Sequence, residues 1–248
     1  MKKVSFAFWS AILCTALFAQ NVQNYKNLNW RVFHWLSFSN YVDINSEEWT
    51  KMPRRNKLSL MQIPEDELLT MPTEKLIQAY IDCAFARNFF LHSSIESYYN
   101  ELYNSFNGVR ELMKREDAFE EIIKFYSSMD SQDSAISAAG LPMRFQIQFI
   151  EYLIGNPRLL EGSNHEQLLN LATELIKKSQ RRTAIQYAED NLQSNTYALA
   201  QLLASPSSNR KNDLIQIDQI DFLLKTGRIP NEAITFQILN LAKDFASY

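Results

Sequence analysis

The sequence predicts an all-α protein in which amphipathic helical hairpins form an irregular bundle or an α-solenoid-like array. Five glycines and seven prolines among 248 residues are few for a barrel or sandwich built from many tight turns. From residue 73 onward, apolar residues recur every three or four positions, the spacing that places them on one face of a helix. Because each helix is apolar on one side only, it must bury that side against a neighbour.

Residues 1–19 have the layout of a secretory signal peptide. Two lysines precede an apolar run from Val4 to Phe18. This run is shorter than the roughly 20 residues that a helix needs to cross a bilayer. We therefore expect cleavage after Ala19, no permanent membrane span, and an extracytoplasmic location, periplasmic or secreted. A lipid anchor on Cys14 is less favoured, because Leu13 stands where lipoprotein signals carry a small residue.

Composition excludes some classes of function. The formal net charge is -3, and loss of the two leader lysines lowers Lys+Arg from 25 to 23 against 28 acids, a net charge of -5. Neither value is typical of a nucleic-acid-binding protein. After cleavage Cys83 is the only cysteine, so no intramolecular disulfide can form, and its apolar neighbours at helical spacing predict a small buried side chain.

Four segments follow from the patterning. After the leader comes an aromatic-rich N-terminal arm, residues 20–58, in which NWRVFHWLSFSNYV has mixed periodicity and is interpreted as helix, with an extended arm as the alternative. Residues 59–130 form a helical subdomain, DSQDS at 130–134 is a polar linker, and residues 131–248 form C-terminal helical hairpins. No fixed repeat period is found, which weakens a strict repeat assignment.

The expected helices can be placed from their apolar stripes and from the residues that end them. Asn107 and Gly108 are expected to end the second stripe in a left-handed conformation, with residues 109–114 as a connecting turn. Asn164 or Ser163 is expected to cap a later helix. The apolar stripes cover residues 76–85, 95–106, 118–126, 142–155, 168–176, 183–204, 214–224 and 234–245, with a turn at 227–231.

SLMQIPEDELLTMPTEKL, residues 59–76, is a dense acidic stretch that we interpret as two helix starts. Proline suits a first helical turn, and the acids after Pro64 complement the positive end of the helix dipole. Thr73 is expected to cap the next helix, with Met71 packing across it. A calcium loop is disfavoured because the stretch has no glycine. The acids at 116, 117, 120 and 121 follow the same logic, with Lys124 four residues after Glu120.

A resemblance to a known family is carried by two stretches within residues 58–128. They are QIPEDELLTMPTEKLIQAYIDCAF and YYNELYNSFNGVRELMKREDA. They resemble a segment of secreted proteins from gut-type Bacteroidetes and some Firmicutes, a family without an established biochemical activity. Where those proteins carry Asn-Tyr-Pro, this chain has Asp82-Cys83-Ala84, so its helix is expected to continue further. The resemblance implies export and a helical fold and transfers no catalytic residue. The matching residues are Gln62, Ile63, Pro64, Glu65, Thr73, Glu74, Leu76, Phe106, Asn107, Gly108, Glu111, Leu112, Arg115, Asp117 and Ala118.

Familiar catalytic and metal-binding motifs are missing from the sequence. The histidines at 34, 92 and 165 are scattered and form no local zinc motif, and neither a Gly-x-Ser-x-Gly elbow nor a glycine-rich phosphate loop occurs. We therefore expect no metal and no cofactor. A glycosidase-type carboxylate pair needs only two acids about 5 to 10 Å apart, and 28 acids leave the choice open. The pairs Arg54–Arg55 and Arg181–Arg182 are interpreted as ordinary surface.

The candidate binding residues are aromatic. Tyr98, Tyr99 and Tyr103 lie on one helical stripe and would suit a carbohydrate platform if exposed, although such stripes usually belong to a core. The tryptophans of the N-terminal arm could line a groove or hold the arm to the bundle; they are Trp30, Trp35 and Trp49. The leading hypothesis is an exported, non-enzymatic helical domain that binds a protein, peptide or glycan, with a structural envelope component also open. The alternative is an extracytoplasmic hydrolase of glycans or peptides that uses dispersed carboxylates.

Overall fold

A computed structural model describes residues 47–83, 89, 91–130, 142–184 and 192–247. These residues form an all-α protein, as the sequence predicts, and the described part contains no strand. The signal-peptide prediction and most of the arm prediction fall outside the described residues. The elements are α2 (Glu47–Lys51), α3 (Arg54–Leu60), α4 (Glu65–Thr70), α5 (Thr73–Asp82), α6 (Ile95–Ser105), α7 (Asn107–Leu112), α8 (Ala118–Ser128), α9 (Met143–Ile154), α10 (Pro157–Leu160), α11 (His165–Ala184), α12 (Gln193–Ala204), the 3₁₀ turn η3 (Pro206–Ser208), α13 (Lys211–Leu214), α14 (Ile220–Thr226) and α15 (Glu232–Ala246).

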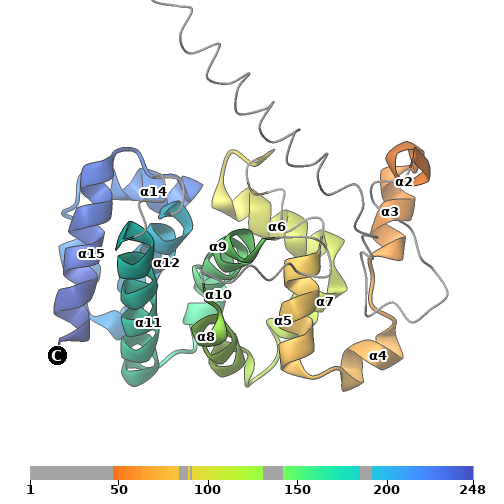
Figure 1. Ribbon diagram of the computed structural model, residues 1–248, viewed down its shortest axis with the longest axis horizontal. Helices are drawn as coiled ribbons and strands as arrows, with labels where there is room; N and C mark the ends of the chain where they lie inside the picture. Colours follow the sequence, from red (N-terminus) through yellow and green to blue (C-terminus); the bar gives the residue numbers. More distant parts are fainter. Residues whose placement is uncertain (1–46, 84–88, 90, 131–141, 185–191, 248) are drawn as a thin grey trace, which may run out of the picture.

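The helices lie side by side along the long axis of the molecule, with α2–α4 at one end and α15 at the other (Figure 1). Helix α5 packs on α7, α8 and α9, α9 packs on α12, and α11 and α12 pack on α15. This is an irregular array of hairpins in which each helix buries its apolar stripe on its neighbours. No described helix is long and apolar enough to cross a membrane.

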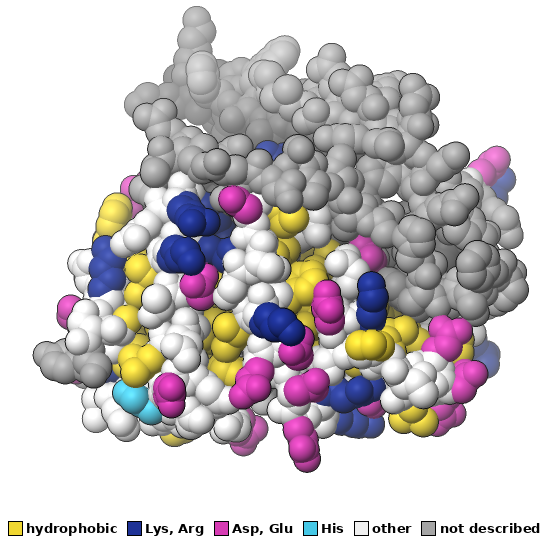
Figure 2. Space-filling model, turned by 60° about the horizontal axis from the view of Figure 1, so that its bottom comes forward, with side chains coloured by type: hydrophobic (Ala, Val, Ile, Leu, Met, Phe, Trp, Pro, Cys, Tyr) yellow, Lys and Arg dark blue, Asp and Glu magenta, His cyan; other side chains and the backbone are white. Residues whose placement is uncertain are grey.

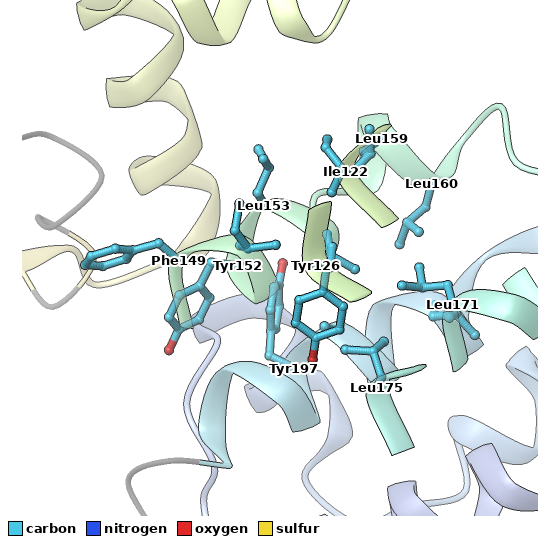
Figure 3. Close-up of a cluster of buried hydrophobic side chains, with 14 of the residues drawn as sticks. Ile122, Tyr126, Phe149, Tyr152, Leu153, Leu159, Leu160, Leu171, Leu175 and Tyr197 are labelled. Carbon is cyan, nitrogen blue, oxygen red and sulfur yellow. The ribbon is translucent and has the colours of Figure 1, made fainter. Parts of the chain in front are cut away.

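The hydrophobic core runs without interruption through both halves of the described chain. Figure 3 shows its middle, where Tyr126 of α8 and Leu175 of α11 approach Tyr197 of α12. Buried residues before position 131 and after position 141 therefore belong to one core. Cys83 is completely buried in it, as expected for a small apolar side chain.

The acidic run does form two helix starts. Pro64 precedes α4, and Glu65, Asp66 and Glu67 occupy its first turn. Thr73, however, does not cap α5, because Pro72 stands at the cap position and the Thr73 hydroxyl donates to Asp117 instead, 2.8 Å from Oδ1.

Two expectations about helix ends are wrong. Helix α5 ends at Asp82 and does not continue, because the backbone of Cys83 is extended and its amide bonds to the carbonyl of Tyr80. The pair Asn107–Gly108 does not end a helix in a left-handed conformation, because both residues lie inside α7. The expected connecting turn is thus mostly helical.

The C-terminal half follows its apolar stripes with two shifts. The helix predicted at 183–204 begins only at Gln193, because Thr183 and Ala184 still belong to α11. Helix α11 begins with a reciprocal cap, in which the side chains of Asn164 and Gln167 each accept from the other's amide. The helix expected at 214–224 begins only at Ile220, because Gln219 has φ 60°, a left-handed conformation that a continuous helix cannot contain. Gly227, with φ 67°, ends α14 as glycine readily does.

Candidate functional site

The structure places the sequence-predicted aromatic residues in different settings. Trp30 and Trp35 lie outside the described residues. Trp49 belongs to α2, but its side chain is not described. A groove lined by these tryptophans therefore stays a prediction.

Tyr98 and Tyr99 are buried, so the exposure that a carbohydrate platform needs is missing at both positions. Their hydroxyls lie within a network of tyrosines from α5, α6, α9 and α12. The Tyr98 hydroxyl is 3.2 Å from that of Tyr80, and the Tyr99 hydroxyl donates to the carbonyl of Tyr152. We define the buried tyrosine cluster as Tyr80, Tyr98, Tyr99, Tyr152 and Tyr197.

Each phenol of the buried tyrosine cluster has its pKa raised above the ordinary value of about 10, mainly because burial disfavours the phenolate. The Tyr80 hydroxyl donates to the carbonyl of Phe149 and the Tyr197 hydroxyl to that of Gly155. These bonds satisfy buried carbonyls at the helix contacts. The cluster therefore joins helices through polar contacts inside an apolar core.

Tyr103, the third tyrosine of the stripe, is half-buried at the edge of the same helix. The guanidinium carbon of Arg158 lies 4.5 Å from its ring centre, and the side-chain amide of Asn156 donates to its hydroxyl at 2.8 Å. One face of the ring is thus covered by a cation. The three stripe tyrosines do not form a shared exposed surface.

A fully buried carboxylate, Glu151 of α9, is the main polar site of the interior. Oε1 accepts from the Tyr126 hydroxyl at 2.6 Å and from the Asn195 side-chain amide at 3.1 Å. Oε2 accepts from the Ser194 hydroxyl at 2.6 Å, and the Arg182 guanidinium donates to both oxygens, at 3.0 Å to Oε2. All the hydrogen-bonding capacity of a carboxylate is used here, so this acid holds α8, α9, α11 and α12 together.

The cations beside this carboxylate are also buried. The prediction that Arg181–Arg182 is ordinary surface is wrong for Arg182, which is buried against Glu151. Burial is the largest single influence on the pKa of Arg182 and acts to lower it, but the Glu151 charge, Tyr126 and the hydrogen bonds to both together outweigh burial, so that this pKa is raised. Burial lowers the pKa of Lys178, whose ammonium donates to the carbonyl of Met129 and lies 4.9 Å from the ring centre of Tyr126.

The Glu151 site is not among those predicted from the sequence, although the sequence carries a signal for it. MRFQIQFIEYLI places one acid among the apolar residues of α9. A carboxylate at such a position needs partners, because burying an unpaired charge is very costly. The partners Arg182 and Asn195 come from other helices, and no local spacing connects them to Glu151.

The two parts of the family-like segment lie against each other in the structure. The side chain of Asn107 accepts from the amide of Ile63 at 2.9 Å and donates to its carbonyl at 2.7 Å. In return, Gln62 accepts from the amide of Asn107 at 3.0 Å. Position 108 has no room for a larger residue than glycine, because a Cβ there would lie 2.5 Å from the Phe106 ring.

Other residues of the segment pair in the same way. Besides the bond from Thr73 to Asp117, Arg115 donates to the carbonyl of Leu68 at 3.0 Å and pairs with Glu111 at 2.7 Å. The segment is therefore a structural lock between positions 62–76 and 106–118. Its acids belong to this lock or to exposed helix starts, and the described residues contain no group of three His, Cys, Asp or Glu placed to hold a metal ion.

A second polar site lies at the surface, at the start of α6. The ring of His92 bridges two side chains of that helix, with Nδ1 3.1 Å from the Ser97 hydroxyl and Nε2 2.9 Å from Glu101 Oε2. Arg54 of α3 donates to the other oxygen of Glu101 at 2.7 Å. Arg228, from the turn after α14, donates to the carbonyl of His92 at 3.0 Å.

Charge elsewhere on the surface is dispersed. The face shown in Figure 2 carries acids and bases interspersed with apolar side chains. The sequence spacing suggested that Lys124 pairs with Glu120. In the structure its ammonium pairs with Glu121 instead, at 3.2 Å. Comparison of the chain with protein-family models, curated proteins and solved structures found no match.

Proposed function

We propose that the protein is an exported helical domain that binds a protein partner through the apolar surface of its last hairpin. The observation that carries this proposal is the exposure of Phe236, which is 65% exposed on α15. The opposite face of α15 is buried on α11 and α12, so the helix is already held and its phenylalanine is left on the surface.

Further apolar side chains are exposed in the same part of the chain. Phe222 of α14 is 47% exposed and Ile215 is 51% exposed. Leu239, half-buried, lies three residues after Phe236, the spacing of neighbours along one helix face. Fully burying a phenylalanine contributes about 1.5–3 kcal/mol, so a few such residues suffice for an interface hot spot.

The chemistry of these residues favours a protein or peptide over a glycan. Phenylalanine, leucine and isoleucine carry no hydroxyl or N–H to pair with sugar hydroxyls, whereas apolar protein surfaces match them. Helix α15 stands at one end of the array (Figure 1), the position at which a partner would continue the helix packing.

Export and family membership belong to the same proposal. Export is supported by the charged start and apolar run of residues 1–19. Membership in the secreted family is supported by the residues quoted above, some of which, such as Thr73 and Asn107, bond across the lock. N-terminal sequencing of native protein should find a mature start at Gln20, and an intact Met1 would overturn the export proposal.

The binding proposal is tested by crosslinking. A photoreactive benzoylphenylalanine at position 236 should give a specific adduct in native envelope extract, and the same probe at exposed Lys124 of α8 should not. Excess unlabelled wild-type protein should remove the adduct. Protein carrying Phe222→Ser and Phe236→Ser should fail to compete. Equal crosslinking at both positions, or full competition by the double variant, would exclude this surface as the binding site.

A further inference from the structure

We propose that Ser97 is a nucleophile for ester hydrolysis. His92 activates the Ser97 hydroxyl, and Glu101 positions the His92 ring. This activity goes beyond the binding function and differs from the dispersed-carboxylate chemistry that the sequence left open. The three side chains form a chain of hydrogen bonds in which the serine is exposed to solvent and the histidine and glutamate are mostly covered.

The geometry satisfies the requirements for a nucleophile, a base and an orienting group. Ser97 Oγ lies 3.1 Å from His92 Nδ1, and Glu101 Oε2 lies 2.9 Å from Nε2. With the imidazole proton on Nε2, that N–H donates to Glu101 and Nδ1 accepts the serine proton. The ring nitrogens are used in the order opposite to that of chymotrypsin-like triads, but the sequence of roles is the same.

The fold holds His92 in this position from several sides. Its amide donates to the carbonyl of Phe89 at 3.1 Å, and its own carbonyl accepts from Arg228. Its ring lies edge-on to Tyr98, with ring centres 5.9 Å apart. A base fixed in this way loses little freedom when it takes up a proton.

The start of α6 supplies a favourable electrostatic setting. The amides of a first helical turn have no partner within the helix, and the positive end of the helix dipole stabilises negative charge. Ser94 caps the helix by accepting from the Ser97 amide at 3.2 Å. Because the Ser97 amide is already bonded to Ser94, it is the helix dipole that stabilises negative charge developing on a carbonyl oxygen beside Ser97.

The reaction needs only these side chains, the ester and water. Ser97 Oγ attacks the ester carbonyl while its proton moves to His92 Nδ1, and the alcohol leaves with that proton, giving an acyl-serine. Water then gives one proton to Nδ1, its oxygen adds to the acyl carbon, and Ser97 leaves and recovers the proton. The products are a carboxylic acid and an alcohol. Glu101 stabilises the imidazolium formed in each half.

The substrate class is a carboxylic ester with an apolar acyl group. Leu91, the residue before His92 in the sequence, is 80% exposed and offers an apolar contact for the acyl group. Esters are favoured over amides because an alkoxide is a better leaving group than an amide nitrogen. Exposure of Ser97 at a helix start also admits an ester carried on a large molecule.

The first test uses a fluorophosphonate probe and p-nitrophenyl acetate with the full mature chain. Peptide mapping should find the probe on Ser97, and Ser97→Ala should abolish both labelling and hydrolysis. Ser93→Ala, at a nearby exposed serine, is the matched control and should leave both unchanged. His92→Gln should slow labelling by about 100-fold or more. No adduct on Ser97, or equal labelling of wild type and His92→Gln, would overturn the proposal.

The second test separates the positioning role of Glu101 from a structural one. Glu101→Gln should lower kcat by about 10-fold or more with KM unchanged. Glu65→Gln, at an exposed acid of α4, is the matched control and should leave kcat within about twofold. Circular dichroism and thermal unfolding check the fold of each variant. A loss of kcat in Glu101→Gln no larger than that in Glu65→Gln would contradict positioning through His92.

Discussion

Replacing either member of the buried pair Glu151–Arg182 should strongly destabilise the protein. Arg182→Met leaves the Glu151 carboxylate buried with three neutral donors, and Glu151→Met leaves the guanidinium buried without its counter-charge. Removing one partner of a buried ion pair costs about 3–5 kcal/mol, because the remaining charge keeps its desolvation penalty. For a chain of this size, that corresponds to a fall in Tm of about 6–20 °C.

The double variant sharpens this prediction. With both charges removed no buried charge is left, so the double variant should be more stable than the sum of the single losses predicts, by about 2 kcal/mol. Urea unfolding followed by circular dichroism gives the free energy of unfolding for each protein. The matched control on the same helix, Lys177→Met, removes a surface pair of 3.1 Å and should cost less than about 1 kcal/mol. A loss below about 1 kcal/mol in Arg182→Met, or strictly additive losses, would refute the reasoning.

Three further predictions concern the lock and the tyrosines. Asn107→Ala removes both hydrogen bonds to Ile63 and should lower the free energy of unfolding by about 2 kcal/mol, while exposed Asn100→Ala on α6 should change it by less than about 0.5 kcal/mol. Gly108→Ala should cost about 1–3 kcal/mol, because its Cβ would lie 2.5 Å from the Phe106 ring, and unchanged stability in urea would argue against that contact. The raised pKa values of the buried tyrosine cluster mean that the unfolded chain releases its phenolic protons first. Stability should therefore be fully present below about pH 10 and fall as the pH rises above it. As the pH rises, the absorbance of tyrosinate should increase over the same range in which the helical signal falls. Titration of these phenols in a chain that is still folded would contradict their burial.

Local apolar spacing predicted the helices because it reflects a requirement of each segment alone. Helices α6, α8 and α15 begin and end within a few residues of their predicted stripes, since an amphipathic helix carries its own period. The start of α4 was also predictable, because proline and acids act on the first turn of their own helix.

The candidate sites were less predictable because their partners are far apart in the sequence. Glu151 and Arg182 come from different helices, and His92 meets Arg228 across 136 positions. Ser97 and Glu101 are four residues apart and share a helix face, but nothing in their spacing indicates that a histidine bridges them.

The sequence by itself determined that this protein is helical and which side of most helices is buried, because helical periodicity and the hydrophobic effect act segment by segment. Tertiary structure decided the places where neighbours override local preference. Gly108 lies inside α7, where a side chain would clash with the Phe106 ring, and Thr73 bonds Asp117 because folding brings α5 against the start of α8. Such outcomes depend on distances between chain segments, and these distances are set only when the whole core is packed.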